Sequence, residues 1–215
     1  MKAGKPREAR PAGARPQPAR GARAHEVRLI GGAWKRSKLP VADRPGLRPS
    51  PDRVRETLFN WLGQDLGGWT VLDAFAGSGA LGFEAASRGA TEAILLERDA
   101  ALVASLNASR ARLKAEAVLR VERADALAWM AACAPSRFDL VFVDPPFDSG
   151  LGARALAAAA CITREGGFVY LEAGEPLADL PVGFELQRHA RAGAVHFHLL
   201  RRGYTAAEPS PRTAP

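Results

Sequence analysis

The length of 215 residues is typical of one domain with extensions, and a hydrophobic fraction of 47% is sufficient for a buried core. No apolar run approaches the length that crosses a bilayer, and the basic start lacks the apolar region of a secretory signal. We therefore expect a cytoplasmic protein with no membrane partner. Cys133 and Cys161 fit neither a disulfide framework nor a metal cluster, so we also expect no metal.

The net charge of +7 is concentrated at the N-terminus. Residues 1–25 carry a net charge of +6, residues 26–56 one of +4, and residues 57–215 one of −3. This asymmetry favours a basic arm that binds a polyanion, although a basic tail can also serve solubility alone. The role of the tail itself stays open.

The first 62 residues divide into a tail and a structured extension. Residues 1–25 are rich in Pro, Arg and Ala, which predicts a disordered basic tail, and residues 204–215 have the same character. VRLIGG and SKLPV predict two short strands of a ribbon, and DRVRETLFNWL predicts an amphipathic helix. The cations of residues 26–62 are therefore held in place, and held cations bind anions more specifically than loose ones.

Residues 63–203 alternate between strand and helix patterns. Strands are predicted at 69–75, 93–97, 117–122, 138–144 and 166–172, and helices at 79–89, 99–114, 126–133 and near 150–160. This alternation predicts an α/β, Rossmann-like fold with a mostly parallel sheet and helices on both faces. Residues 183–190 and 194–202 predict an antiparallel C-terminal hairpin at one edge, which makes seven strands.

Acidic residues end or follow four successive strands: Asp73, Glu97, Asp125 and Asp144. Ligands of open α/β sheets bind beyond the carboxyl ends of the strands. One acid there can simply cap the following helix, an alternative that stays open for Asp125. Four acids at the same rim indicate a ligand site.

The first of these loops contains Gly77-x-Gly79-x-x-Gly82, which matches the dinucleotide fingerprint. A nicotinamide dinucleotide would place its pyrophosphate beside Asp73, which is electrostatically unfavourable. S-adenosylmethionine carries a positive charge and an amino-acid end. Asp73 could face its ammonium side, Glu97 could bind the ribose, and Asp125 could meet the adenine edge.

The stretch VFVDPPF ends a buried strand abruptly, because Pro145 and Pro146 have no N–H to continue the ladder. It is either a strand terminator with a capping acid or a rigid clamp for a planar group that bears an amine.

DAFAGSGALGFEA followed at a distance by VDPPF resembles the class I methyltransferases that act on exocyclic amino groups. With RLIGGAWKRSKLPV and RPSPDRVRETLFNWL before them, these motifs resemble the bacterial RsmD family over residues 27–202. The resemblance implies a class I methyltransferase domain with S-adenosylmethionine as cofactor and S-adenosylhomocysteine as product. It also implies transfer of the methyl group to N2 of one guanine in small-subunit (16S) ribosomal RNA.

On this reading, the Asp144 side chain and the Pro145 carbonyl accept the two N–H groups of the guanine amine, and Phe147 stacks on a flipped base. The predicted catalytic residues are Asp144, Pro145, Pro146 and Phe147. The predicted cofactor-binding residues are Asp73, Phe75, Ala76, Gly77, Ser78, Gly79, Glu97, Arg98, Asp125, Ala126 and Asp144. The predicted RNA-binding residues of the extension are Arg28, Lys35, Arg36, Lys38, Arg48, Arg53 and Arg55.

Two other functions compete with this one. A DNA amino-methyltransferase lacks room here, because the roughly 70 residues after Phe147 are used in completing the sheet. A non-catalytic RNA-binding assembly factor is disfavoured by the intact Asp144 and glycine loop. We expect the small ribosomal subunit as partner, no DNA, and a monomer. The sequence does not reveal which guanine is chosen, or whether naked RNA or the assembled subunit is the substrate.

Overall fold

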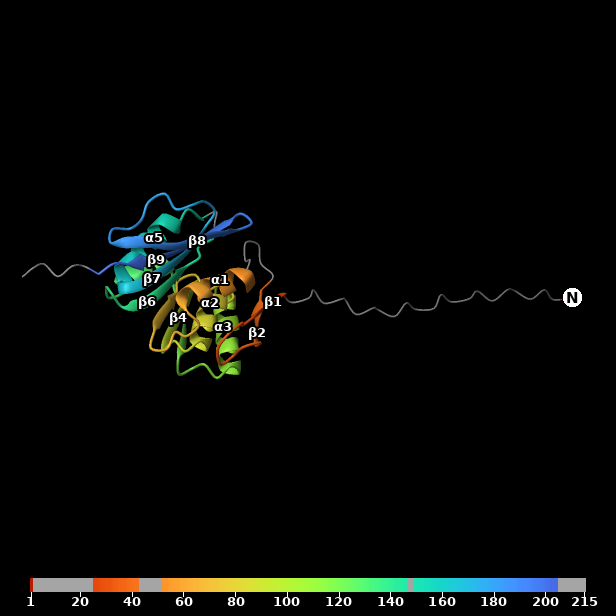
Figure 1. Cartoon of the computed structure of the whole chain (residues 1–215). Helices are drawn as coiled ribbons and strands as arrows, with labels where there is room; N and C mark the ends of the chain where they lie inside the picture. The colour runs from red at the N-terminus through yellow and green to blue at the C-terminus, as the bar shows by residue number, and fades with distance from the viewer. Residues whose placement is uncertain (2–24, 43–51, 147–148, 205–215) are drawn as a thin grey trace, which may run out of the picture.

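A seven-stranded sheet with the strand order β5-β4-β3-β6-β7-β9-β8 forms the centre of the computed structural model (Figure 1). The structure describes residues 1, 25–42, 52–146 and 149–204. Residues 2–24 and 205–215 of the predicted tails lie outside the described residues, so these predictions stay predictions, whereas His25, predicted as part of the tail, is the first residue of β1.

Five strands of this sheet are parallel and two close one edge. The parallel strands are β3 (Thr70–Asp73), β4 (Glu92–Glu97), β5 (Leu119–Arg123), β6 (Phe138–Val143) and β7 (Thr163–Ala173). The antiparallel hairpin consists of β8 (Phe184–Ala192) and β9 (Val195–Arg202), with β9 paired to β7. The predicted fold class and edge hairpin are confirmed.

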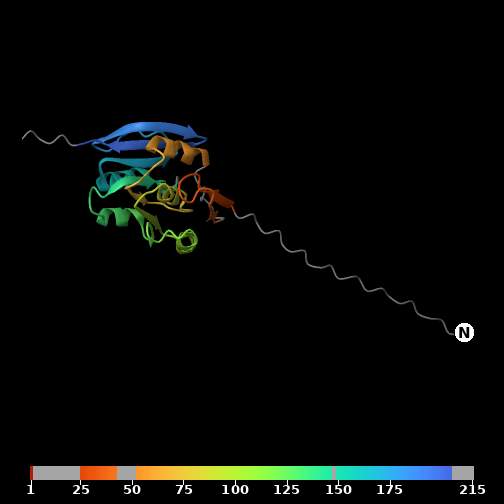
Figure 2. The ribbon, with the colours of Figure 1, turned by 60° about the horizontal axis from the view of Figure 1, so that its bottom comes forward.

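Helices cover both faces of the sheet, as the alternation of elements requires. The helices on one face are α1 (Asp52–Leu62), α2 (Ala80–Ser87) and α3 (Ala100–Arg112), and those on the other are α4 (Ala126–Ala132) and α5 (Gly152–Ile162). All six residues of β6 are buried, which fits its largely apolar sequence, and its single acid, Asp139, accepts hydrogen bonds from the Thr70 N–H and hydroxyl. Figure 2 shows α1, in orange, beside the blue strands β8 and β9, where Trp61 stacks on Phe197 with ring centroids 5.2 Å apart.

The N-terminal ribbon pairs β1 (His25–Arg28) with β2 (Lys38–Val41) and lies along α2. Val27 and Val41 contact Ala80 at the start of the helix. At its other end, the Ala33 N–H donates to the Ser87 carbonyl at 2.7 Å. The turn of the ribbon therefore lies one length of α2 away from the carboxyl ends of the strands, roughly 12 Å for eight residues.

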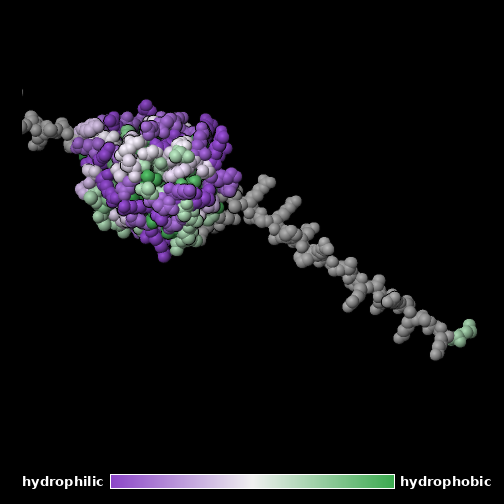
Figure 3. Space-filling model, turned by 90° about the horizontal axis from the view of Figure 1, so that it is seen from below, coloured by the Kyte–Doolittle hydropathy of each residue, from purple (hydrophilic) through white to green (hydrophobic). Residues whose placement is uncertain are grey.

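None of the helices in the described residues is both long enough and apolar enough to cross a membrane. Figure 3 shows one face of the molecule, on which hydrophilic residues surround a smaller central group of apolar ones.

Candidate active site

Asp73 ends β3 and is buried at the carboxyl rim of the sheet, with 3% of its surface exposed. Its Oδ2 accepts a hydrogen bond from the Gly82 N–H at 2.9 Å. The pKa of Asp73 is raised from 3.8 to about 7, chiefly by burial; the charge of Glu97 contributes to this rise, and hydrogen bonds from the backbone oppose it. A carboxyl group at this position is thus costly to ionise unless a cation comes close.

Glu97 ends β4, and both of its carboxylate oxygens are anchored. Oε2 accepts from the Gly77 N–H at 3.0 Å, and Oε1 accepts from the Asp99 N–H at 2.8 Å. The two bonds fix the carboxylate against the glycine loop, and each oxygen retains a second lone pair. Glu97 is therefore oriented to accept a hydrogen bond from the hydroxyl group of a ligand beside that loop.

The glycines of the loop serve packing as well as any ligand. Gly79 has φ +78, and a Cβ there would lie 2.7 Å from the Phe83 ring. A Cβ on Gly82 would lie 2.6 Å from Leu95 of the neighbouring strand. Part of the Gly-x-Gly-x-x-Gly signal therefore reports the close approach of α2 to the sheet.

Asp144 follows β6 directly and is half-buried, beside a buried Pro145 and an exposed Pro146. Burial raises the pKa of Asp144 well above its ordinary value, and the negative charges of Glu172 and Asp73 add to the rise. The Pro146 carbonyl accepts from the Ser149 N–H at 3.0 Å and is thus engaged within its own loop. Phe147 lies outside the described residues.

The acids of the rim have acidic neighbours. Among the residues that the structure describes, the charges acting on Asp144 are those of Glu172 and Asp73, and the charge acting on Asp73 is that of Glu97. Like charges gathered in a buried place mark functional sites. A positively charged ligand would lower the cost of keeping these carboxylates ionised. In the described ranges, no group of three or more acidic, His or Cys side chains is arranged to hold a metal ion.

The other residues predicted to bind the cofactor take several places. Asp125 is exposed, and its side chain caps α4 by accepting a hydrogen bond from the Ala128 N–H at 2.9 Å. This is the helix-capping role that was the alternative to binding the cofactor. Arg98 is exposed, whereas the remaining three side chains lie in or beside the hydrophobic core; they are Phe75, Ala76 and Ala126. Ser78 is half-buried in the glycine loop.

The cations predicted to bind RNA are mostly exposed. Arg28 lies 4.0 Å from Asp52 in an ion pair, and Lys38 lies 2.7 Å from Glu26. Three further exposed cations are Lys35 and Arg36 in the turn of the ribbon and Arg53 on α1. Arg48 lies outside the described residues.

Arg55 does not belong to this surface, because its side chain is completely buried. Its guanidinium donates to Asp52 at 2.6 Å, to the Arg28 carbonyl at 2.9 Å and to Glu84 at 3.5 Å. It braces α1 against the ribbon and α2, and we withdraw it from the RNA-binding set. Its position four residues before the buried Phe59 places it on the inner face of α1, a signal that the sequence contained.

Glu172 is an acid of the same rim that sequence reasoning missed. It lies near the end of β7 with 5% of its surface exposed, and its Oε1 accepts from the Tyr170 hydroxyl at 2.8 Å. The predicted strand 166–172 ended in this acid, so the pattern that identified Asp73 and Asp144 applied to it as well.

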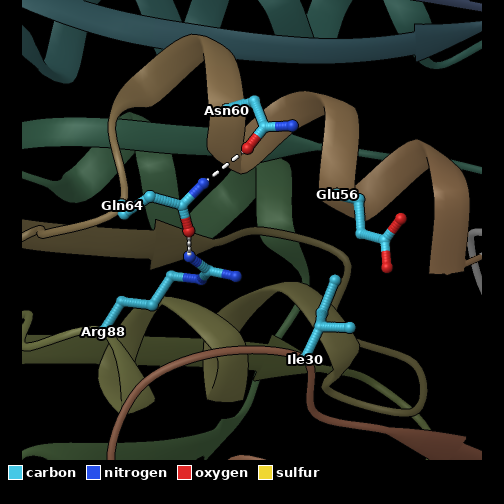
Figure 4. A pocket seen from close by; sticks show the side chains of 5 residues that line it. All are labelled: Ile30, Glu56, Asn60, Gln64 and Arg88. Carbon is cyan, nitrogen blue, oxygen red and sulfur yellow. Dashed lines mark hydrogen bonds between the residues drawn. The ribbon is translucent and has the colours of Figure 1, made fainter.

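A polar pocket of about 230 Å³ lies elsewhere, between α1 and the end of α2 (Figure 4). In it the Gln64 side chain accepts from Arg88 and donates to Asn60. Because α2 begins at the carboxyl rim and ends near this pocket, the pocket is separate from the acidic site.

Comparisons with known proteins agree with this geometry. A family model described as Conserved hypothetical protein 95 matches residues 27–201. Ribosomal RNA small subunit methyltransferase D of Escherichia coli K12 is 42% identical over 185 residues, which cover 82% of this chain and 90% of that protein. The protein of the same name from Haemophilus influenzae is 43% identical over 136 residues, covering 61% of this chain and 69% of that protein.

Solved structures give the same answer. A putative methyltransferase from Escherichia coli superposes with a TM-score of 0.74 at 41% identity, covering 84% of this chain and all of that chain. The motifs, the order of the strands and these relatives agree, and the chain belongs to the RsmD family of class I methyltransferases.

Proposed function

We propose that this protein transfers a methyl group from S-adenosylmethionine to the exocyclic N2 of one guanine in 16S ribosomal RNA. The observation that carries the proposal is the half-buried Asp144 beside Asp73 at the rim, following a strand that two prolines end. The name of the Escherichia coli relative, a small-subunit ribosomal RNA methyltransferase, supports the class of substrate. The guanine 966 type of target rests on the family resemblance.

The described residues fit S-adenosylmethionine. Its ammonium group would supply the positive charge that the buried Asp73 lacks, and its ribose would meet the anchored Glu97. When bound, the cofactor supplies an activated methyl group, whose transfer breaks its bond to sulfur and leaves the electron pair on sulfur. The product S-adenosylhomocysteine has lost the sulfonium charge and would bind the acidic rim less favourably.

Asp144 acts on the other reactant, the amine. The lone pair of a guanine amine is delocalised into the ring, so the nitrogen is a poor nucleophile. A carboxylate that accepts one N–H and a Pro145 carbonyl that accepts the other favour a pyramidal nitrogen with an available lone pair. Asp144 then takes the proton that the nitrogen releases as the new N–C bond forms.

The cations of the extension would hold the RNA through its phosphates. We rank these cations by their expected distance from the acidic rim. Arg28 and Lys38 belong to the paired strands of the ribbon, whereas Lys35 and Arg36 belong to its turn, which lies farther from the rim. We expect the double variant Arg28→Gln/Lys38→Gln to weaken RNA binding and flatten its dependence on salt more than Lys35→Gln/Arg36→Gln. Equal effects of the two pairs would contradict the ranking.

The decisive experiment measures transfer of labelled methyl groups to small subunits from a strain that lacks this modification. Asp144→Ala should lower the rate by about 10³-fold, since it removes the main acceptor of the amine. Glu185→Gln, at an exposed acid on β8 that pairs with Arg201 at the opposite end of the strands, is the matched control and should leave the rate unchanged. Mass spectrometry of the RNA then identifies the modified nucleotide.

The alternatives have their own outcomes in this experiment. Transfer to DNA in place of ribosomal RNA would indicate a DNA amino-methyltransferase. Tight binding to the subunit without any transfer would indicate an assembly factor. Transfer that survives Asp144→Ala would refute the role given to this acid.

A further inference from the structure

Glu172 and Asp144 face the same side of the sheet on neighbouring strands. The register pairs Phe142 with Tyr170 and Val143 with Leu171. Asp144 directly follows the last residue of β6, and Glu172 is the next residue of β7, so each lies two positions beyond a member of the Phe142–Tyr170 pair. Because side chains alternate along a strand, both acids lie on the face of Phe142 and Tyr170, the face that α1 and α2 cover.

The Tyr170 hydroxyl holds Glu172 in a defined orientation. Tyr170 is completely buried and donates to the Glu172 carboxylate at 2.8 Å. Its ring meets the Phe142 ring nearly at right angles, with centroids 6.1 Å apart, which fixes the ring in turn. Burial and the charge of Glu172 raise the pKa of Tyr170 well above its ordinary value, so the hydroxyl remains a donor.

The groups that face Asp144 come from each element around it. Asp73 faces it from β3, itself influenced by Glu97 of β4, and Glu172 and Tyr170 face it from β7. The helices on this side contribute apolar side chains to the core, including Val54, Leu58, Phe59, Leu81 and Ala85. The buried charged side chains of these helices form ion pairs with one another, since Glu84 binds both Arg55 and Arg88.

We propose that Glu172, held by Tyr170, is a positioning residue that sets Asp144 as a strong proton acceptor for the substrate amine. The inference rests on the proposed function and adds to it a residue that does not touch the substrate. When the amine nitrogen gains the methyl group, positive charge moves onto it and one proton leaves for Asp144. A second fixed negative charge behind Asp144 favours both changes, because the field is present before the reaction starts.

The first test needs no catalysis. Carbon NMR of ligand-free protein labelled at aspartate carboxyls should give a lower titration midpoint for Asp144 in Glu172→Gln than in the wild type, because a repelling charge is gone. Loss of the signal in Asp144→Asn assigns it. Glu185→Gln, at an exposed acid on β8, is the control and should leave the midpoint in place.

The second test is the pH dependence of methyl transfer to small subunits. Glu172→Gln should lower kcat about tenfold, leave KM for the subunit unchanged, and move the acid limb of the profile to lower pH. Tyr170→Phe should move the limb in the same direction, because Glu172 without its donor ionises less readily. Glu172→Asp retains the charge and should keep the limb near that of the wild type.

The outcomes separate this inference from the proposed function. An Asp144 midpoint and an acid limb that both stay in place in Glu172→Gln would overturn the inference, whatever the loss of stability. A midpoint that moves in a protein whose wild type transfers no methyl group to ribosomal RNA would support the coupling and overturn the proposed function instead.

Discussion

Among the residues that the structure describes, two groups of buried acids differ in the charged neighbours that act on them. Near the end of α2, Glu84 accepts from the Ile30 and Gly31 N–H groups at 2.8 and 2.7 Å and from Arg88 at 2.9 Å, and it also pairs with Arg55. At the carboxyl rim, Asp73 and Asp144 are surrounded by further acids and have raised pKa values.

The difference teaches how to separate a structural cluster from a binding site. Glu84 pairs with both arginines, so the cluster joins the ribbon, α1 and α2 without a ligand, although the Arg55 Nε finds no hydrogen-bond partner among the described residues. The acids of the rim are costly in the empty protein and become favourable when a cation arrives. The pocket beside Arg88 resembles the structural cluster, since three of its polar side chains, Asn60, Gln64 and Arg88, are hydrogen-bonded to one another (Figure 4).

The largest effect is expected from breaking the paired cluster. Glu84→Gln leaves two buried guanidinium groups without their carboxylate and should lower the free energy of unfolding by about 3 to 5 kcal/mol. Urea denaturation followed by circular dichroism measures the change. Glu92→Gln removes a partly exposed ion pair with Arg137 and should cost less than about 1 kcal/mol. Comparable losses in the two variants would mean that the buried cluster has no special role.

The pH dependence of stability should reveal the acids of the rim. Asp73 has a folded pKa of about 7 and an ordinary value of 3.8, so between these values the folded state retains a proton that the unfolded state has lost. Stability contributed by this group is present at low pH and decreases as pH rises towards 7. From pH 5 to pH 8, Asp73 alone should lower the free energy of unfolding of the ligand-free protein by about 3 kcal/mol. A flat profile over this range would be evidence against a buried, protonated Asp73.

Removing the charge of Asp73 should have the opposite sign to removing that of Glu84. Asp73→Asn keeps an oxygen for the Gly82 N–H and loses the repulsion, so at pH 8 the ligand-free protein should gain about 2 kcal/mol. The same variant should bind S-adenosylmethionine more weakly, which calorimetry measures. A destabilised Asp73→Asn with unchanged affinity would assign Asp73 to the structural kind of cluster.

The smallest expected effect is a change in bound protons. At pH 6.5 Asp73 is largely protonated in the ligand-free protein, and an ammonium group beside it would favour the ionised form. Binding of S-adenosylmethionine should therefore release up to about one proton. Calorimetry in buffers of different ionisation enthalpy counts it, and no release in the wild type would place the ammonium group away from Asp73.

Much of this architecture could be predicted from the sequence because it depends on local patterns. Buried parallel strands need apolar runs, a tight strand-to-helix loop needs glycine, and Pro145 and Pro146 end an interior strand because they offer no N–H to its neighbours. The same patterns identified Asp73, Glu97 and Asp144, since an acid at the end of each strand must lie at one rim of the sheet.

Only the tertiary structure decided which charges face which. Helical spacing alone could place Arg55 on the inner face of α1, but only the fold brings its guanidinium to Glu84 of α2. Glu172 approaches Asp144 because β7 pairs with β6, a neighbour relation between strands that are separated by a whole helix in the chain. Sequence patterns report whether a residue faces inward, whereas ionisation depends on distances between groups that only the packed fold brings together.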